Sequence, residues 1–149
     1  MDELQIRLAT AADIPVLIHQ RRCMFEDMGK LSEAEVTAIV EAYVPYIHRA
    51  LSGGAYRGYL AETPAGQAVA GGGVMLWDRL GRPRAYICNI YTEPEYRRRG
   101  LARRLMETLI GWCRAEGLTS IDLHASEAGR PIYAALGFEP TNEMRLTFK

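Results

Sequence analysis

Cysteine and histidine are scarce in this chain. The 149 residues include three cysteines, Cys23, Cys88 and Cys113, and three histidines. The cysteines are odd in number, show no Cys-x-x-Cys spacing and lie far from any histidine cluster. These features argue against a disulfide framework and against a zinc site. We therefore expect a cytoplasmic protein without a metal.

Long apolar runs and an excess of one charge are also missing. No run approaches the roughly 20 apolar residues that span a bilayer, and the opening Met1-Asp2-Glu3 does not resemble a signal peptide. The 18 basic and 18 acidic residues cancel, so attraction to nucleic acid or to an anionic membrane is not indicated. Residues 1–52 nevertheless hold eight acids against five bases, a bias that suits a cationic acceptor.

Length and periodicity predict one mixed α/β domain over residues 1–149. Gly71-Gly72-Gly73 lies inside an apparent strand and predicts a bulge or a close backbone approach rather than a phosphate loop, because no helix follows it directly. The expected elements begin with a strand over 4–8 and a helix from Thr10 to Arg21. A second helix starts at the capping box Ser32-x-x-Glu35 and is expected to kink or break at Pro45. Strands over 56–61 and 67–77, a turn over 78–84, a strand over 85–91, a helix over 101–116, a strand over 120–124, a helix through Tyr133 and a last strand follow.

The most informative segment is an arginine-rich loop between the strand at 85–91 and the following helix. It contains Arg97-Arg98-Arg99-Gly100-Leu101-Ala102, and five arginines fall between Arg97 and Arg104. A loop at a helix start directs unpaired backbone N–H groups toward one point, and the helix dipole adds positive potential there. The segment therefore predicts a site for a polyanion such as a pyrophosphate. A solvated basic face is the alternative.

Two motifs together resemble the GCN5-related N-acetyltransferases (GNATs). Residues 94–102 look like the family's acetyl-CoA pyrophosphate loop, and Tyr133-x-x-x-Gly137-Phe138 looks like its second signature, a helix followed by a Gly-Phe turn. The resemblance is strong over residues 85–149. It implies a mostly antiparallel sheet flanked by helices, with a splayed strand pair that forms the acetyl-CoA cleft. Small domains of this family often form homodimers.

The resemblance also implies which residues bind acetyl-CoA. Backbone groups around residues 90–92 are expected to pair with the pantetheine arm, and amides from about Arg98 to Arg103 to hold the pyrophosphate. Ser126 stands where many members have a cofactor-contacting asparagine, so the finer contacts differ here. The cofactor-binding set is Ile90, Tyr91, Thr92, Arg97, Arg98, Arg99, Gly100, Leu101, Ala102, Arg103 and Ser126.

The chemistry requires a general base more than a general acid. An amine with a pKa near ~10.4 is almost fully protonated at pH 7, which costs the attacking amine roughly 4–5 kcal/mol. Tyr133 matches the family tyrosine that hydrogen-bonds or protonates the departing thiolate; the alternative is a tyrosine that only packs on the Gly-Phe turn. Residues 86–91 carry no carboxylate, so Glu26 is the first candidate base. His124 is the alternative base.

The remaining candidates concern the acceptor amine. Residues 24–28 are expected to follow the first helix and to line the acceptor site, and Asn89 lies on the central strand. The substrate-binding set is Asp27, Met28, Asn89 and His124. The sequence thus predicts an acetyl-CoA-dependent N-acetyltransferase that acts directly on a primary amine. A catalytically silent acetyl-CoA sensor and a nucleic-acid-binding domain that uses the arginines remain as alternatives.

Overall fold

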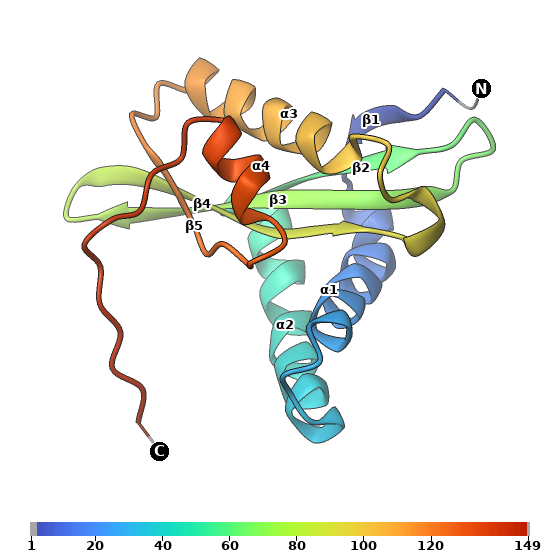
Figure 1. Ribbon diagram of the computed structural model, residues 1–149, viewed down its shortest axis with the longest axis horizontal. Helices are drawn as coiled ribbons and strands as arrows, with labels where there is room; N and C mark the ends of the chain where they lie inside the picture. The colour runs from blue at the N-terminus through green and yellow to red at the C-terminus, as the bar shows by residue number, and fades with distance from the viewer. Residues whose placement is uncertain (1–2, 149) are drawn as a thin grey trace.

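The computed structural model describes residues 3–148. Its centre is one sheet of five strands in the order β1-β2-β3-β4-β5, which is also their order along the chain. The first four strands run antiparallel to their neighbours, and β5 runs parallel to β4 (Figure 1). The strands are β1 Gln5–Leu8, β2 Tyr56–Glu62, β3 Ala68–Arg79, β4 Arg82–Thr92 and β5 Ile121–Leu123.

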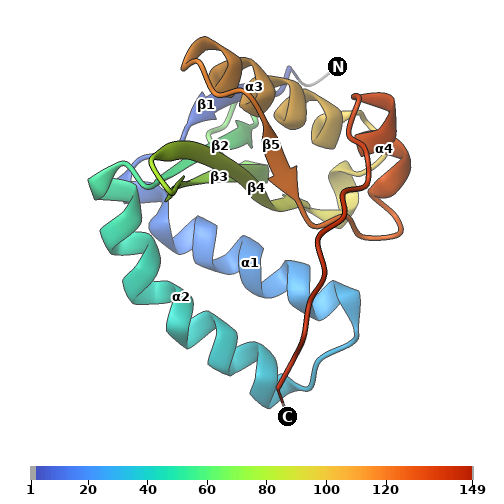
Figure 2. The same ribbon diagram turned by 90° about the vertical axis from the view of Figure 1, so that its left-hand side faces the viewer.

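Helices cover both faces of this sheet. Figures 1 and 2 show α1 (Ile14–Met28) and α2 (Glu33–Gly53) on one face, with α3 (Leu101–Ala115) and α4 (Arg130–Ala135) on the other. Apolar side chains are buried in both layers: Leu17, Ile47 and Leu60 on the α1/α2 side, and Leu105 and Leu109 under α3. The mixed α/β fold expected from the sequence is confirmed.

The two N-terminal helices are longer than the sequence predicts. Helix α1 continues past Arg21 and ends only at Gly29, whose left-handed φ of 64° closes the last turn. The capping box of α2 is confirmed, since Ser32 and Glu35 exchange hydrogen bonds of 3.0 and 3.1 Å. Of the kink or break expected at Pro45, the break is wrong, because α2 continues through this residue to Gly53. Proline removes only one intrahelical bond, and Pro45 is exposed while the opposite face of α2 stays buried against the sheet.

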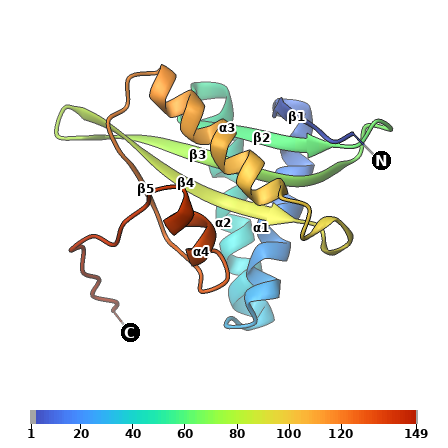
Figure 3. The same ribbon diagram turned by 45° about the horizontal axis from the view of Figure 1, so that its top comes forward.

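The expected turn over 78–84 is also wrong, because β3 and β4 pair almost to their ends. Asp78 pairs with Pro83 and Arg79 with Arg82, which leaves Leu80 and Gly81 as the loop. Both loop residues have positive φ, 53° and 87°. Two such residues match the right-handed twist of a hairpin, so a two-residue loop suffices. The long hairpin is visible at one end of the sheet in Figure 3.

A bulge in β4 faces the glycine run of β3. Gly71 pairs with Tyr91 and Gly73 with Cys88, so Gly72 alone opposes Asn89 and Ile90. Side chains cross each of the glycines: a Cβ on Gly72 would lie 2.4 Å from Ile90 Cδ1, and similar collisions with Gln20 and Tyr56 would occur at Gly71 and Gly73. The bulge expected from Gly71–Gly73 is therefore confirmed, with its extra residue in β4, whereas the groups that approach the glycines closely are side chains rather than backbone.

The last expected strand is not formed. After α4, residues 139–148 have no regular structure and extend away from the body of the protein (Figure 1). Met144, Leu146 and Phe148 are 98%, 79% and 88% exposed. A strand needs an edge to pair with, and this segment pairs with none of the strands described.

A compact charge cluster joins β1, β2 and the start of α1. Arg7 donates to both carboxylate oxygens of Asp13 at 2.8 and 2.9 Å and to Glu62 at 2.7 Å. Asp13 also accepts from the Thr10 N–H at 2.7 Å. The Arg7 guanidinium lowers the pKa of Asp13 from 3.8 to about 2.

We expect this cluster to make the folded state sensitive to acid. A lowered folded-state pKa stabilises the protein above about pH 4, and that contribution is lost as the pH falls toward 2. Between pH 6 and pH 3 the free energy of unfolding of the wild type should fall by about 1 kcal/mol more than that of Asp13→Asn, measured by urea denaturation. The control Asp78→Asn removes an exposed carboxylate and should follow the wild type. Equal pH slopes for the wild type and Asp13→Asn would contradict the prediction.

Candidate active site

Strands β4 and β5 pair only briefly. Their parallel ladder consists of Ala85 with Ile121, Tyr86 with Asp122 and Ile87 with Leu123. An Arg84–Asp122 ion pair of 2.6 Å holds this junction. Beyond it β5 ends, while β4 continues through residues 88–92 with β3 on one side and, within residues 3–148, no strand on the other. We call residues 88–92 the free β4 edge. Its backbone can pair with an extended ligand, as an edge strand pairs with a peptide.

Helix α3 begins just beyond the free β4 edge. Its first backbone bond runs from the Arg104 N–H to the Gly100 carbonyl, at 3.0 Å. The N–H groups of Leu101, Ala102 and Arg103 therefore have no acceptor inside the helix. Arg98 and Gly100 adopt left-handed φ values of 62° and 75°, which turn the loop into the helix start. This geometry is that of an anion site.

Most of the arginine side chains in this loop already have partners. Arg97 in particular donates to the Thr92 carbonyl at 2.9 Å and to Asp27 at 2.6 Å. An anion at this loop would therefore meet backbone N–H groups more than unpaired arginine side chains. The other paired arginines are Arg99 with the Glu95 carbonyl, Arg103 with Glu107 and Arg104 with the Leu4 carbonyl.

Tyr133 lies on α4, on the α3 side of the sheet. Its ring meets Phe138 edge-on at a centroid distance of 6.1 Å, and burial raises the pKa of its hydroxyl. A Cβ on Gly129 would lie 2.7 Å from the ring, so glycine is needed there. The predicted helix and Gly-Phe turn are confirmed, because Gly137 has a φ of 98° and the Phe138 N–H closes on the Tyr133 carbonyl at 3.0 Å.

Two other predicted residues lie between β5 and α4. Ser126 is exposed, and its Oγ accepts from the Gly129 N–H at 3.1 Å, so it shapes the turn before α4. Its hydroxyl proton remains available to a ligand. His124 directly follows β5 and is exposed. The β4–β5 ladder stops one residue earlier, at Leu123, so no pairing places His124 opposite Asn89.

The predicted acceptor residues Glu26, Asp27 and Met28 do not form a loop. They occupy the last turn of α1 and are exposed. The Asp27 carboxylate is bound by Arg97, so it links α1 to the arginine loop. Glu26 makes no side-chain hydrogen bond or ion pair with a described residue. Glu26 thus keeps an uncommitted carboxylate, whereas Asp27 does not.

Asn89 sits in the bulge and is buried, with a left-handed φ of 60°. Its Oδ1 accepts from Arg21 Nη1 at 2.6 Å, and its Nδ2 donates to the Tyr56 hydroxyl at 3.1 Å. Arg21 stacks on the rings of Phe25 and Tyr43, 4.9 Å from each centroid. Burial raises the pKa of the neighbouring Cys88 thiol to about 11, so this thiol is no nucleophile at neutral pH.

Sequence reasoning missed two groups of residues near the free β4 edge. Arg21, Tyr43 and Tyr46 read as ordinary helix positions, since only the helix packing brings them to β4. His19 and Glu93 form a second group, with a 2.8 Å contact between Nε2 and Oε1 across 74 positions of sequence. The sequence offered one signal for each group: Arg21 is a polar residue on an apolar helical face, and Glu93 is a carboxylate after a strand. Both signals are too common to be diagnostic.

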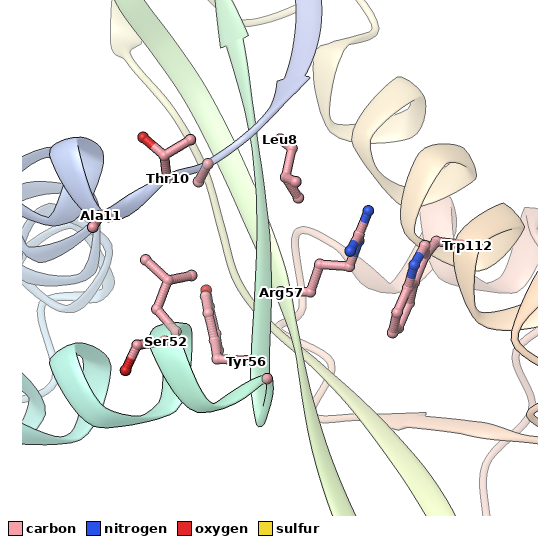
Figure 4. Close-up of a pocket in the computed structure, with 10 residues that line it drawn as sticks. Leu8, Thr10, Ala11, Ser52, Tyr56, Arg57 and Trp112 are labelled. Atoms are coloured by element: carbon pink, nitrogen blue, oxygen red, sulfur yellow. The ribbon is translucent and has the colours of Figure 1, made fainter.

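A separate surface pocket of about 230 Å³ lies away from this site (Figure 4). It is lined by the end of β1, the end of α2, the start of β2 and Trp112 of α3. Arg57, its only charged lining residue, is stacked 4.8 Å from the Trp112 ring and donates to the Tyr59 hydroxyl at 2.9 Å. The pocket is linked to the free β4 edge by Tyr56, which lines the pocket and accepts the hydrogen bond from Asn89.

The family follows from comparison with known proteins. A model of the acetyltransferase (GNAT) family matches residues 22–138. The chain belongs to this family. It is 30% identical over 126 residues to a glucosamine 6-phosphate N-acetyltransferase of Trypanosoma brucei brucei, covering 81% of this chain and 84% of that protein. The chain is therefore a GNAT acyltransferase, as the sequence predicts.

Solved GNAT structures share the fold over nearly the whole chain. A GCN5-related N-acetyltransferase from Ralstonia eutropha superposes with a TM-score of 0.91 at 27% identity, covering 98% of this chain and 99% of that one. A predicted acetyltransferase from Clostridium acetobutylicum, solved with acetyl-CoA, gives 0.87 at 26% identity, covering 98% and 96%. Among residues 3–148, no helix is long and apolar enough to cross a membrane, and no three His, Cys, Asp or Glu side chains cluster as metal ligands do.

Proposed function

We propose that this GNAT protein transfers the acetyl group of acetyl-CoA directly to a primary amine of a small molecule or peptide. The observation that carries the proposal is the arrangement of the free β4 edge next to the unpaired amides of α3. An extended pantetheine arm fits the free β4 edge, and a pyrophosphate fits the unpaired amides of α3. The acetyl-CoA in the similar Clostridium acetobutylicum structure supports the same donor here.

The donor contacts that we propose are mainly backbone contacts. Residues 90–92 would pair with the pantetheine arm, and the loop from Arg97 to Arg103 would hold the pyrophosphate through its amides. Gly100 and Ala102 leave room for the phosphates because they carry little or no side chain. Ser126 would contact the donor through its free hydroxyl proton.

The proposed chemistry needs a proton acceptor for the amine and a proton donor for the leaving thiolate. Tyr133 suits the second role, because its hydroxyl stays protonated at neutral pH and can donate a hydrogen bond to the departing thiolate. Glu26 is the proposed base, acting through water because its carboxylate is exposed. His124 is the alternative base. Asn89 and Asp27 would act by holding Arg21 and Arg97 in place.

The acceptor is proposed as an amine, on the basis of the family and of one named relative. Glucosamine 6-phosphate, the amine in the name of the trypanosomal relative, belongs in any first panel of acceptors. The three cysteines are all free thiols, which suits the reducing cytoplasm that we propose as the location.

We also propose a homodimer in which residues 139–148 bind a second copy. In an extended conformation Met144, Leu146 and Phe148 point to the same side, since side chains alternate along a strand. All three are more than three-quarters exposed in one copy. Strand β5 lies at the outer edge of the sheet and offers a place for such a segment to pair.

The first experiment tests donor binding and transfer together. Calorimetric titration should give micromolar binding of acetyl-CoA, and thiol release should accompany acetylation of at least one amine in a broad panel. Tyr133→Phe should leave acetyl-CoA affinity within about twofold and lower kcat by roughly 10²-fold or more, the size of a general-acid effect. Phe138→Tyr, which alters the partner ring instead, should retain most of the activity.

The possible results separate the alternatives. Binding of acetyl-CoA without turnover of any amine would favour a sensor over an enzyme. No detectable binding would refute the proposed donor site. Full activity in Tyr133→Phe would remove the tyrosine from the mechanism while leaving the transferase proposal intact.

The dimer is tested by light scattering coupled to size-exclusion chromatography. The wild type should elute with twice the mass of one chain, and a variant with a stop codon at Glu139 should elute as a monomer. The triple substitution Met144→Ser, Leu146→Ser and Phe148→Ser should weaken the dimer without shortening the chain. A monomeric wild type, or a truncated protein that still dimerises, would contradict the proposal.

A further inference from the structure

The Arg21 guanidinium carries a charge that no described residue neutralises. It forms no ion pair within residues 3–148, and its single hydrogen bond to the protein runs from Nη1 to Asn89 Oδ1. Of its other nitrogens, Nε is enclosed without an acceptor. Nη2 also lacks an acceptor but is not fully enclosed. Arg21 therefore keeps an unused donor that a ligand can reach.

The surroundings hold this guanidinium in a fixed position. Its plane stacks on Phe25 from α1 and on Tyr43 from α2, and Asn89 fixes one edge of it. The hydroxyl of Tyr46 is enclosed with no hydrogen-bond partner, and its ring lies 6.2 Å from that of Tyr43. An arginine that only braced the bulge would not need a partly accessible Nη2, whereas a preorganised donor set is typical of an anion site.

No carboxylate near Arg21 forms an ion pair with it among residues 3–148: Glu26 is uncommitted, and two others are bound elsewhere. Asp27 pairs with Arg97 and Glu93 contacts His19, so neither carboxylate pairs with Arg21. A half-buried arginine without a carboxylate partner favours an anionic ligand strongly. This local positive charge is opposite to the cationic-acceptor bias suggested by the acidic composition of residues 1–52.

The position of Arg21 relates it to the reaction. Asn89, its partner, belongs to the free β4 edge, one residue before the segment proposed to pair with the pantetheine arm. Tyr133 belongs to α4 and Arg21 to α1, and Figure 2 shows these two helices on opposite faces of the sheet. A molecule that enters from the α1/α2 side would thus meet the guanidinium close to the point of transfer.

We propose that the acceptor is an amine that also carries an acidic group, a carboxylate or a phosphate monoester, and that Arg21 Nη2 binds this group while the amine faces the acetyl donor. The inference deepens the proposed transferase function and rests on it. Arg21 is then a substrate-binding residue that determines specificity.

The test compares amines in matched pairs that differ in the acidic group. β-Alanine against β-alaninamide tests a carboxylate, and O-phosphoethanolamine against ethanolamine tests a phosphate. The anionic member should have the higher kcat/KM by about 10- to 100-fold, the range expected for a charge-assisted hydrogen bond. The pair with the larger ratio of kcat/KM values identifies the acidic group as a carboxylate or as a phosphate.

Variants assign this preference to Arg21. In Arg21→Gln the ratio should fall to about twofold, because only the anionic member of each pair loses a charge-assisted hydrogen bond. Arg22→Gln removes the adjacent positive charge and should keep the full ratio. Tyr46→Phe removes only a hydroxyl and tests the same site if Arg21→Gln does not fold. Equal activity of the wild type on both members of each pair, or a preference that survives in Arg21→Gln, would overturn the proposal.

A binding measurement separates this inference from the function on which it rests. O-Phosphoethanolamine and β-alanine are titrated calorimetrically into the protein with CoA present, so no transfer is required. Binding that Arg21→Gln abolishes and Arg22→Gln retains supports the acidic-group site even if no amine is acetylated. If amines are acetylated but neither anion shows Arg21-dependent binding, the transferase stands and the inference falls.

Discussion

The bulge in β4 is the constraint on which the rest of the site depends. By placing two residues of β4 opposite the single Gly72, it changes the alternation of the strand. Cys88 packs toward α1 and α2, Asn89 bonds Arg21 and Tyr56 on the same face, and Ile90 packs toward α3. The irregular strand thereby presents a polar group to one helical layer and an apolar group to the other, at the point where β5 diverges.

The bulge brings together several residues whose roles are only weakly indicated by the sequence. Asn89 adopts a left-handed φ that costs a non-glycine residue roughly 1 kcal/mol, and its two side-chain hydrogen bonds offset that cost. The glycines of β3 give Gln20, Ile90 and Tyr56 room to cross the strand. The fold and the site are thus stabilised by the same contacts.

The sequence predicted those features that local patterns encode. The capping box at Ser32, the β2–β3 pair, the amphipathic α3 and the Gly137-Phe138 turn all depend on residues a few positions apart, and all are confirmed. The predictions of a helix break at Pro45 and of a turn over 78–84 were wrong. Long-range packing of α2 and pairing of β3 with β4 outweighed the local signals that usually interrupt a helix or a strand. The last strand failed because a strand depends on pairing with a distant edge, and residues 139–148 pair with none of the described strands.

The candidate site was also predictable only in part, because some of its residues belong to local motifs and others meet only through long-range packing. The arginine loop and Tyr133 belong to local motifs, whereas Arg21, His19 and Tyr46 reach β4 only through the packing of α1 and α2. The sequence could not show that Arg97 is bound by Asp27, or that Arg103 is paired with Glu107. The sequence showed that the loop carries several positive side chains, but it could not show which groups these side chains contact.

The measurement that tests this account most directly is backbone amide hydrogen exchange by NMR, with and without acetyl-CoA. If the free β4 edge and the start of α3 form the donor site, amides at residues 90–92 and 98–103 will gain protection on binding. The amides of β1 and of the β3–β4 hairpin loop will not change. Binding of acetyl-CoA that protects neither segment would contradict the account, since the donor would then lie elsewhere on the protein.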